Sequence, residues 1–215
     1  MTDRKILSSG RSQLPVRGII SDLGRVIVDF DHHVCTRKLS KLSGKPEEEI
    51  HEYIYMSKMD TRFDSGKITG KEFYKFIETY LKTGISFSEF SAIFSKIFTL
   101  MSPTIEFYRE LKECGLKFCL LSNTNELHYS YCKKEYPELK LFESTVLSYK
   151  TGVMKPHPRI YIEAVNKLRL KPQECVYIDD IPEYAEAANL LEINGIRFKN
   201  IAQVRRELEK LGVKL

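Results

Sequence analysis

The sequence predicts an α/β protein with a doubly wound parallel sheet and a small all-helical domain inserted into it. Two observations carry this prediction. From residue 103 onward, short apolar strands alternate with helix-spaced apolar segments, which is the pattern of a parallel sheet covered by helices. Residues 33–98, in contrast, place apolar side chains at helical spacing and show almost no strand-like alternation.

The chain of 215 residues has room for one sheet domain and a smaller insert. We expect a flexible tail over residues 1–16, because this segment is polar and basic and contains Ser-Ser-Gly. We expect the α/β core to comprise residues 17–32 and 101–215. The helical insert is expected over residues 33–100.

The first strand organises the rest of the prediction. The apolar, β-branched pair Ile19-Ile20 leads to Asp22, and Gly24 lets the backbone turn sharply two residues later. A buried strand that ends in this way places its carboxylate at the carboxyl edge of the sheet, where ligands bind in open α/β proteins.

The insert shows helix-spaced aromatic and aliphatic side chains, divided by breaks at residues 44–46 and 65–67. Ser86 or Ser88 can cap its last helix. The spaced positions are Ile50, Ile54, Phe73, Phe76, Ile77, Tyr80, Phe87, Phe90, Ile93, Phe94 and Ile97.

Strands and helices then alternate to the end of the chain. Pro158 opens one helix as an N-terminal proline, and Gly115 ends another. The expected strands are residues 118–121, 144–148, 175–178 and 195–198, and the expected helices are residues 103–114, 127–134, 158–168, 182–191 and 204–211.

Charge and cysteine content limit the partners and the compartment. The net charge of +5 comes from basic residues interspersed with acidic ones, which argues against a nucleic-acid-binding surface. The five cysteines are scattered, with no Cys-x-x-Cys pair, so we expect free, mostly buried thiols in a cytoplasmic protein and no zinc site. No apolar segment is long enough to span a bilayer or resembles a signal peptide. The oligomeric state is left open.

Three of the expected strands end in polar side chains that together could form a catalytic site. They are Asp22, the pair Ser122-Asn123 and the pair Asp179-Asp180, and Lys155 adds one cation before a helix. Carboxylates from two strand ends form an oxygen-only site suited to Mg²⁺. A carboxylate beside a metal is also a nucleophile towards phosphorus, and a hydroxyl, backbone N–H groups and a lysine can hold phosphate oxygens.

The order Asp-x-Gly-x-Val, Leu-Ser-Asn-Thr-Asn, Lys-Pro and Ile-Asp-Asp resembles the four motifs of the haloacid dehalogenase superfamily. The resemblance implies a Rossmann-like core with a small helical cap inserted after the first motif. Within the cap, residues 63–69 resemble the loop that reaches over the active site. Residues 121–128 and 135–138 are most similar to bacterial sugar-phosphate phosphatases of the glucose-1-phosphate type.

The resemblance also implies roles for single residues. Asp22 is the nucleophile, and Lys155 bridges it to the phosphate. Ser122 and the amide of Asn123 bind the transferred phosphoryl group, and Asp64 of the cap loop contacts the substrate. The implied magnesium ligands are Asp22, the backbone carbonyl of Gly24, Asp180 and Asp179.

Two positions depart from the common pattern. Many relatives carry an aspartate in place of Gly24, where it protonates the leaving group, and an Asp or Asn in place of Tyr184, where it steadies the metal site. The cluster Asp29, Asp31, His32 and His33 could supply the missing acid or could be a solvated loop and helix cap.

The predicted function is a Mg²⁺-dependent phosphatase that hydrolyses a small phosphorylated metabolite, in particular a sugar phosphate, through an aspartyl-phosphate intermediate. Two alternatives remain open: a 2-haloacid dehalogenase, and a weakly active phosphometabolite-binding protein. Because Gly24 cannot donate a proton, we expect sugar 1-phosphates and aryl phosphates to be preferred over sugar 6-phosphates.

Overall fold

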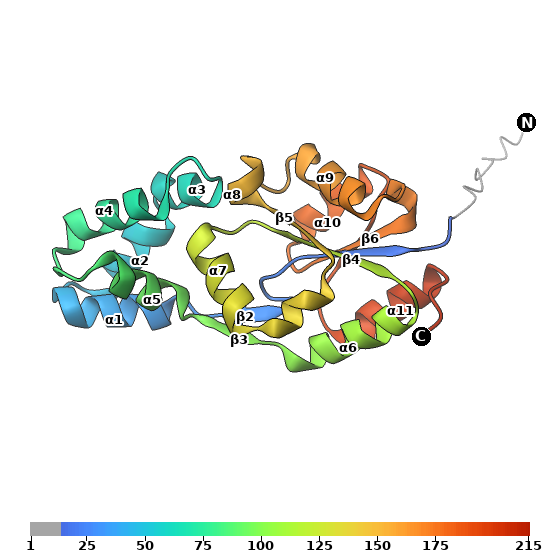
Figure 1. Cartoon of the computed structure of the whole chain (residues 1–215), viewed down its shortest axis with the longest axis horizontal. Helices are drawn as coiled ribbons and strands as arrows, with labels where there is room; N and C mark the ends of the chain where they lie inside the picture. The colour runs from blue at the N-terminus through green and yellow to red at the C-terminus, as the bar shows by residue number, and fades with distance from the viewer. Residues whose placement is uncertain (1–13) are drawn as a thin grey trace, which may run out of the picture.

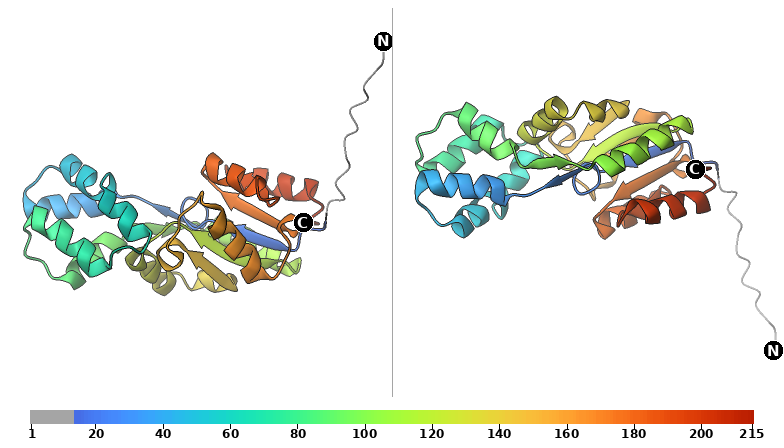
Figure 2. Two further views of the ribbon diagram at one scale, coloured as in Figure 1. Left: turned by 90° about the horizontal axis from the view of Figure 1, so that it is seen from above. Right: turned by 90° about the horizontal axis from the view of Figure 1, so that it is seen from below.

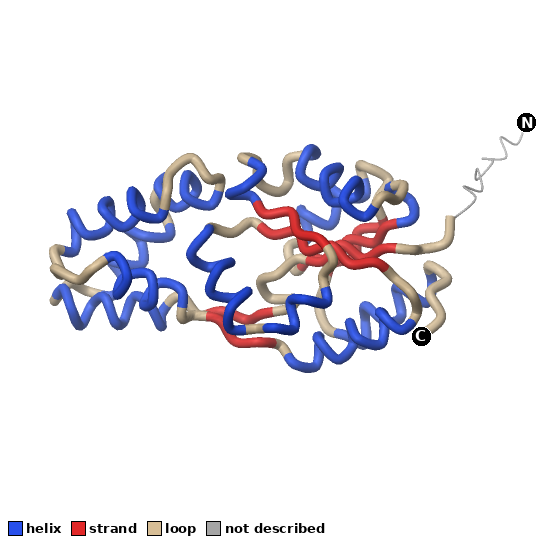
Figure 3. The backbone as a smooth tube through the Cα atoms, viewed as in Figure 1, coloured by secondary structure: helices blue, strands red, loops and turns tan. Residues whose placement is uncertain are grey.

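The computed structural model describes residues 14–215 and shows a five-stranded parallel sheet flanked by helices, with a separate group of helices at one end (Figure 1). Figure 3 shows the same division, with the strands of the sheet in one half and only helices and loops at the far end of the other. Residues 1–13, most of the predicted tail, lie outside the described part. Val16, just before the first strand, packs against the core.

The sheet has the strand order β5-β4-β1-β6-β7, and every neighbouring pair is parallel. The strands β4, β1 and β6 lie side by side at its centre, so their carboxyl ends meet at one edge. The strand bounds are β1 Gly18–Ser21, β4 Lys117–Ser122, β5 Ser144–Leu147, β6 Cys175–Asp179 and β7 Asn194–Arg197.

Helices cover both faces of the sheet (Figure 2). Ile19 contributes to the core beneath α6, α7 and α11, whereas its neighbour Ile20 contributes to the core beneath α9 and α10. A strand that is buried on both faces has a continuous apolar sequence. This is why the pair Ile19-Ile20 indicated strand β1. The helix bounds are α6 Ser102–Glu113, α7 Glu126–Glu135, α8 Ser148–Thr151, α9 Pro158–Leu168, α10 Pro182–Asn189 and α11 Ile201–Lys210, with 3₁₀ turns at Pro137–Leu141 and Pro172–Glu174.

The inserted segment forms five helices around an apolar core of its own. Phe63, Phe73, Phe90 and Phe94 are fully or almost fully buried in this core. Capping boxes start two of the helices, with Thr69 and Glu72 on α4 and Ser86 and Glu89 on α5. The bounds are α1 His33–Ser43, α2 Glu47–Tyr55, α3 Lys58–Asp64, α4 Gly70–Leu81 and α5 Phe87–Ser95.

A short antiparallel ribbon joins the helical unit to the sheet. Strand β2 (Val28–Phe30) pairs with β3 (Phe98–Leu100), so that Phe30 lies opposite Phe98. The expectation that helix continues to Phe98 is therefore wrong, since α5 ends at Ser95. Each ribbon strand has three residues and its partner is distant in the sequence, so no local pattern indicated the pairing. The short helix α8 was not predicted either.

The helical unit also contacts the sheet domain directly. The Ser148 hydroxyl donates a hydrogen bond of 2.6 Å to the backbone carbonyl of Asp64, and the N–H of Gly70 donates one of 2.7 Å to Glu126. At Gly66 a Cβ atom would stand 2.1 Å from the backbone oxygen of Tyr149. Glycine therefore allows a close approach of the two units at this point.

All five cysteines are free, and four of them are buried, as predicted. In the described part of the chain, no helix is both long and apolar enough to span a membrane.

Candidate active site

The predicted strand-end residues come together at the carboxyl edge of the sheet. Asp22 follows β1, and its N–H donates a 2.9 Å hydrogen bond to the carbonyl of Ile178 on β6. Asp179 is the last residue of β6, and Ser122 is the last residue of β4. One carboxylate oxygen each from Asp22, Asp179 and Asp180 lie within 4.8 Å of one another. The expectation that these side chains share one edge is confirmed.

Lys155 lies between two of these carboxylates. Its Nζ donates hydrogen bonds of 2.8 Å to Asp22 and 2.7 Å to Asp179, and its side chain is only 1% exposed. The side-chain amide of Asn123 holds the backbone of Lys155: its oxygen accepts from the Lys155 N–H at 2.8 Å, and its NH₂ donates to the Lys155 carbonyl at 3.1 Å. Asn123 therefore positions the lysine through its side chain, a contact that the sequence did not indicate.

Two tyrosines complete the surroundings of Lys155. The Tyr177 hydroxyl donates to Asp179, whose other oxygen accepts from the N–H of Ile181 at 2.9 Å. The Lys155 ammonium lies 5.0 Å from the ring centroid of Tyr184, within range of a cation–π interaction. Tyr184, which the sequence marked as a departure from the fourth motif, thus lies beside the lysine.

The charges around Asp22 do not balance. Burial, reinforced by the charge of Asp179 and opposed by Lys155, raises the pKa of Asp22 to about 7. Burial and the charge of Asp179 also raise the pKa of Asp180. Burial acts to lower the pKa of Lys155, but the two aspartates outweigh it and raise that pKa. Three carboxylates thus face one buried ammonium, and an additional cation would compensate the excess negative charge.

The same donor set fits a hard divalent cation, because Mg²⁺ prefers carboxylate and carbonyl oxygens. Asp179 already accepts hydrogen bonds at both oxygens, from Lys155 and Tyr177 at one and from Ile181 at the other. Asp22 and Asp180 are therefore better placed than Asp179 to offer a free oxygen to a metal.

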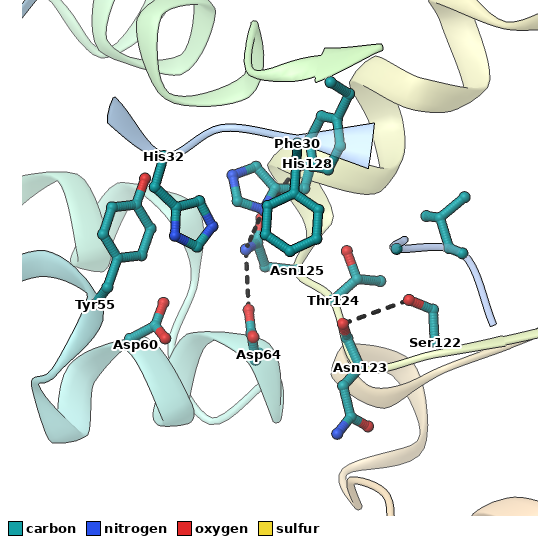
Figure 4. A pocket seen from close by; sticks show the side chains of 13 residues that line it. Phe30, His32, Tyr55, Asp60, Asp64, Ser122, Asn123, Thr124, Asn125 and His128 are labelled. Carbon is teal, nitrogen blue, oxygen red and sulfur yellow. Dashed lines mark hydrogen bonds between the residues drawn. The ribbon is translucent and has the colours of Figure 1, made fainter. Parts of the chain in front are cut away.

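A cavity of about 170 Å³ extends from these strand ends towards the helical unit. Figure 4 shows aromatic side chains on one side of it and carboxylates of α3 on the other. Its lining consists of Leu23, Gly24, Phe30, His32, Tyr55, Asp60, Asp64, Phe98, Ser122, Asn123, Thr124, Asn125 and His128.

Four predicted site residues, Gly24, Asp64, Ser122 and Asn123, line this cavity. A Cβ atom on Gly24 would lie 3.1 Å from Cε1 of Phe30. Asp64 accepts a 2.9 Å hydrogen bond from the side chain of Asn125. Lys67, which belongs to the same predicted cap loop, is exposed and is absent from the lining.

Of the four acids and histidines that follow the first motif, one lines the cavity. His32 stacks on Tyr55 with the ring centroids 3.8 Å apart, and burial lowers its pKa to about 4. Asp29 pairs with Arg25, Asp31 with Arg37 and His33 with Glu47. These pairs agree with a solvated loop and helix cap at these three positions.

The buried histidine His128 was not recognised as a site residue from the sequence. Its Nδ1 contacts the Asn125 amide at 3.1 Å and its Nε2 contacts the Phe94 carbonyl at 3.2 Å. Burial lowers its pKa to about 3, so the ring is neutral. A single histidine in a sequence gives no signal for such a contact.

The fold and the site define a hydrolase class. The family model of haloacid dehalogenase-like hydrolases matches residues 16–191, and the chain therefore belongs to this family of enzymes. D-ribitol-5-phosphate phosphatase of Bacteroides thetaiotaomicron is 23% identical over 200 residues, which are 90% of this chain and 97% of that protein. A solved structure of a family enzyme from the same organism, in complex with magnesium and inorganic phosphate, has a TM-score of 0.79 at 24% identity and covers 88% of this chain and 98% of that one.

Some relatives are matched over only a small part of their own length. Mouse acyl-CoA dehydrogenase family member 10 is 30% identical over 160 residues, which are 70% of this chain but 14% of that protein. Two further curated relatives are matched over 28% and 29% of their length.

Proposed function

We propose that the protein is a Mg²⁺-dependent phosphatase that hydrolyses a small phosphorylated metabolite, a sugar or polyol phosphate, through an aspartyl-phosphate intermediate. The observation that carries the proposal is the cluster of three carboxylates and one buried lysine at the sheet edge where Gly24 and Ser122 line a cavity. The similarity to a ribitol-phosphate phosphatase over nearly both full chains supports the substrate class.

Asp22 is the nucleophile in this proposal. Its carboxylate attacks phosphorus, so that a bond from Asp22 to phosphorus forms while the bond from phosphorus to the leaving oxygen breaks. Water then attacks the same phosphorus, which releases inorganic phosphate and restores the carboxylate. Lys155, held at 2.8 Å from Asp22, balances negative charge near the attacking oxygen.

Ser122 and the loop after it bind the phosphoryl group. Ser122 ends β4 next to β1 and lines the cavity together with Gly24. Among residues 14–215 its hydroxyl has one hydrogen-bond partner, the Asn123 carbonyl at a long 3.4 Å, so it is available to donate to a phosphate oxygen.

Asp22, Asp180 and the backbone carbonyl of Gly24 would hold Mg²⁺, with Asp179 beside them. When bound, the ion supplies positive charge that neutralises phosphoryl oxygens. The excess carboxylate charge also speaks against the dehalogenase alternative, because a site that works without metal gains nothing from it.

The helical unit, residues 33–100, acts as a cap over the site. It contributes Asp60 and Asp64 of α3 to the cavity lining and is hydrogen-bonded to the sheet domain through Ser148 and Glu126. A cap that excludes water favours transfer of the phosphoryl group to Asp22.

Purified protein assayed with p-nitrophenyl phosphate, with and without Mg²⁺, tests the proposal. We expect turnover that EDTA abolishes and Mg²⁺ restores, together with hydrolysis of a sugar or polyol phosphate in a metabolite panel. Halide release from a 2-haloacid without metal, and no phosphate release, would establish the dehalogenase alternative instead.

A further inference from the structure

The proposed phosphatase needs a proton donor for its leaving group, and the assignment of that donor rests on the proposed function. An alkoxide is a poor leaving group, and general acid catalysis typically accelerates its departure by about 10²–10⁴-fold. The proton donor must lie in the cavity that holds the leaving group. Gly24 has no side chain, and the ring of Phe30 lies beside it, so position 24 does not supply this group.

Five titratable side chains line the cavity: His32, Tyr55, Asp60, Asp64 and His128. His128 has both ring nitrogens engaged, by Asn125 and by the Phe94 carbonyl, and has no nitrogen free for a substrate. His32 is stacked face to face on Tyr55, with an interplanar angle of 3°.

The pKa values of His32 and Tyr55 also disfavour proton donation. Burial lowers the pKa of His32 to about 4, so its imidazole is neutral at neutral pH. Burial raises the pKa of Tyr55 well above its ordinary value, which makes its hydroxyl a weak acid. The remaining candidates for the proton donor are the two carboxyl groups of α3, Asp60 and Asp64.

Asp64 is the better placed of the two. Figure 4 shows its carboxyl group between Asp60 and the loop that begins at Ser122. The Asn125 side chain donates to Oδ1 of Asp64 at 2.9 Å, and the Ser148 hydroxyl donates to its backbone carbonyl at 2.6 Å. The N–H of Thr124 in turn donates to Ser148 at 2.9 Å. Asp64 is thus fixed to the loop next to the phosphate-binding Ser122.

One oxygen of Asp64 remains free to carry a proton. Within residues 14–215 no hydrogen bond to its second carboxyl oxygen is formed, and the Asp60 carboxyl group, one helical turn earlier, accepts none from a side chain. No lysine or arginine lines the cavity in the described part of the chain. A carboxyl group without a cation, close to a second carboxyl group, favours its protonated form.

We propose that Asp64 is the general acid and base of the reaction. As the bond from phosphorus to the leaving oxygen breaks, the proton on Asp64 moves to that oxygen, and the product leaves as an alcohol. The resulting Asp64 carboxylate then accepts a proton from the water that attacks the phosphorylated Asp22. This transfer returns Asp64 to its protonated form.

The acidity of Asp64 agrees with this role. Burial raises its pKa to about 6, against the hydrogen bond from Asn125, which lowers it. Burial and the charge of Asp64 raise the pKa of Asp60 to about 8. A catalytic pKa near the working pH suits a group that must both give and take a proton. Asp60 is a positioning residue: its carboxyl group lies close to Asp64, and the two buried carboxyl groups together retain a proton near neutral pH.

Comparison of two leaving groups tests the proposal. Wild type and Asp64→Asn are assayed with Mg²⁺ on p-nitrophenyl phosphate, whose leaving group needs no proton, and on the best alkyl phosphate of the metabolite panel. We expect kcat of Asp64→Asn to fall about 10²–10⁴-fold on the alkyl phosphate and far less on the aryl phosphate. Asp64→Glu should recover part of the alkyl activity. Lys67→Ala, an exposed change on the same loop, should leave both rates unchanged.

Equal losses on the two substrates, with matched thermal unfolding, would show that Asp64 only binds substrate and would overturn the proposal. An unchanged kcat on the alkyl phosphate would overturn it as well, while the phosphatase function would stand. If wild type hydrolyses neither substrate, the proposed function itself is wrong and the role of Asp64 falls with it.

Discussion

The aromatic ring of Phe30 packs against Gly24 and is the nearest neighbour that a side chain on residue 24 would meet. A Cβ atom there would lie 3.1 Å from Cε1 and 3.7 Å from Cδ1 of the ring. Phe30 is itself held by His32, with ring centroids 5.0 Å apart, and by the edge of Phe98 at 6.1 Å. The φ of Gly24 lies outside the left-handed region, so the constraint on this position comes from the neighbouring ring and not from the backbone conformation.

Gly24→Ala is expected to destabilise the protein, because the added methyl group makes the packed ring of Phe30 shift by a few tenths of an ångström. Overpacking of this kind typically costs about 1–3 kcal/mol, measured as the free energy of unfolding in urea. The double variant Gly24→Ala/Phe30→Leu should recover part of this loss. An unchanged unfolding midpoint in the single variant would show that the Phe30 ring moves aside without loss of stability.

Lys155→Met is expected to remove activity and to destabilise the fold. It leaves Asp22 and the fully buried Asp179 without their shared cation, and breaking a buried ion pair on one side typically costs about 3–5 kcal/mol. The control is Lys112→Met at an exposed ion pair with Glu143, which should change stability by less than about 1 kcal/mol. Equal effects of the two changes on urea unfolding would contradict the buried-pair interpretation.

Much of the fold was predictable because its signals are local. The pair Ile19-Ile20 identified a strand buried on both faces, and the Phe residues of the insert identified an independent helical core. Once the sheet is parallel, Asp22, Ser122 and Asp179 must lie at one edge. For this reason the main cluster of the site could be predicted without coordinates.

The remaining contacts depend on residues distant in sequence. No local pattern indicates the ribbon that fixes Phe30 opposite Phe98, and none indicates that Asn125 holds Asp64. Tyr184 appeared only as a departure from a motif, whereas the structure places its ring beside Lys155. These contacts arise from tertiary packing, which sequence patterns do not record.

Stability should fall with acid because of His128. Burial lowers its folded pKa to about 3 from 6.5, so its contribution to stability is complete above the unfolded pKa and is lost as the pH falls below it. Between about pH 7 and pH 5 the loss amounts to about 2 kcal/mol. The free energy of unfolding of wild type should therefore decline by about this much more than that of His128→Gln over the same pH range. Parallel declines would show that His128 titrates normally.

Asp180→Asn is expected to raise the Mg²⁺ concentration needed for half-maximal activity by about tenfold or more, because one anionic oxygen of the donor set is lost. Asp29→Asn, at an exposed acid paired with Arg25, is the matched control and should leave the Mg²⁺ dependence unchanged. A Mg²⁺ titration of p-nitrophenyl phosphate hydrolysis measures both. Identical titration curves for wild type and Asp180→Asn would remove Asp180 from the metal site.

The role of Asp22 as the nucleophile is tested by the phosphatase rate of Asp22→Asn under saturating Mg²⁺. The amide preserves the shape of the side chain but is neither a comparable nucleophile nor an anionic ligand, and thermal unfolding of the variant confirms that it is folded. We predict a loss of at least about 10³-fold in kcat on every substrate that wild type hydrolyses. A folded Asp22→Asn variant that keeps the wild-type rate would contradict the assignment of Asp22 as the nucleophile and, with it, the proposed function.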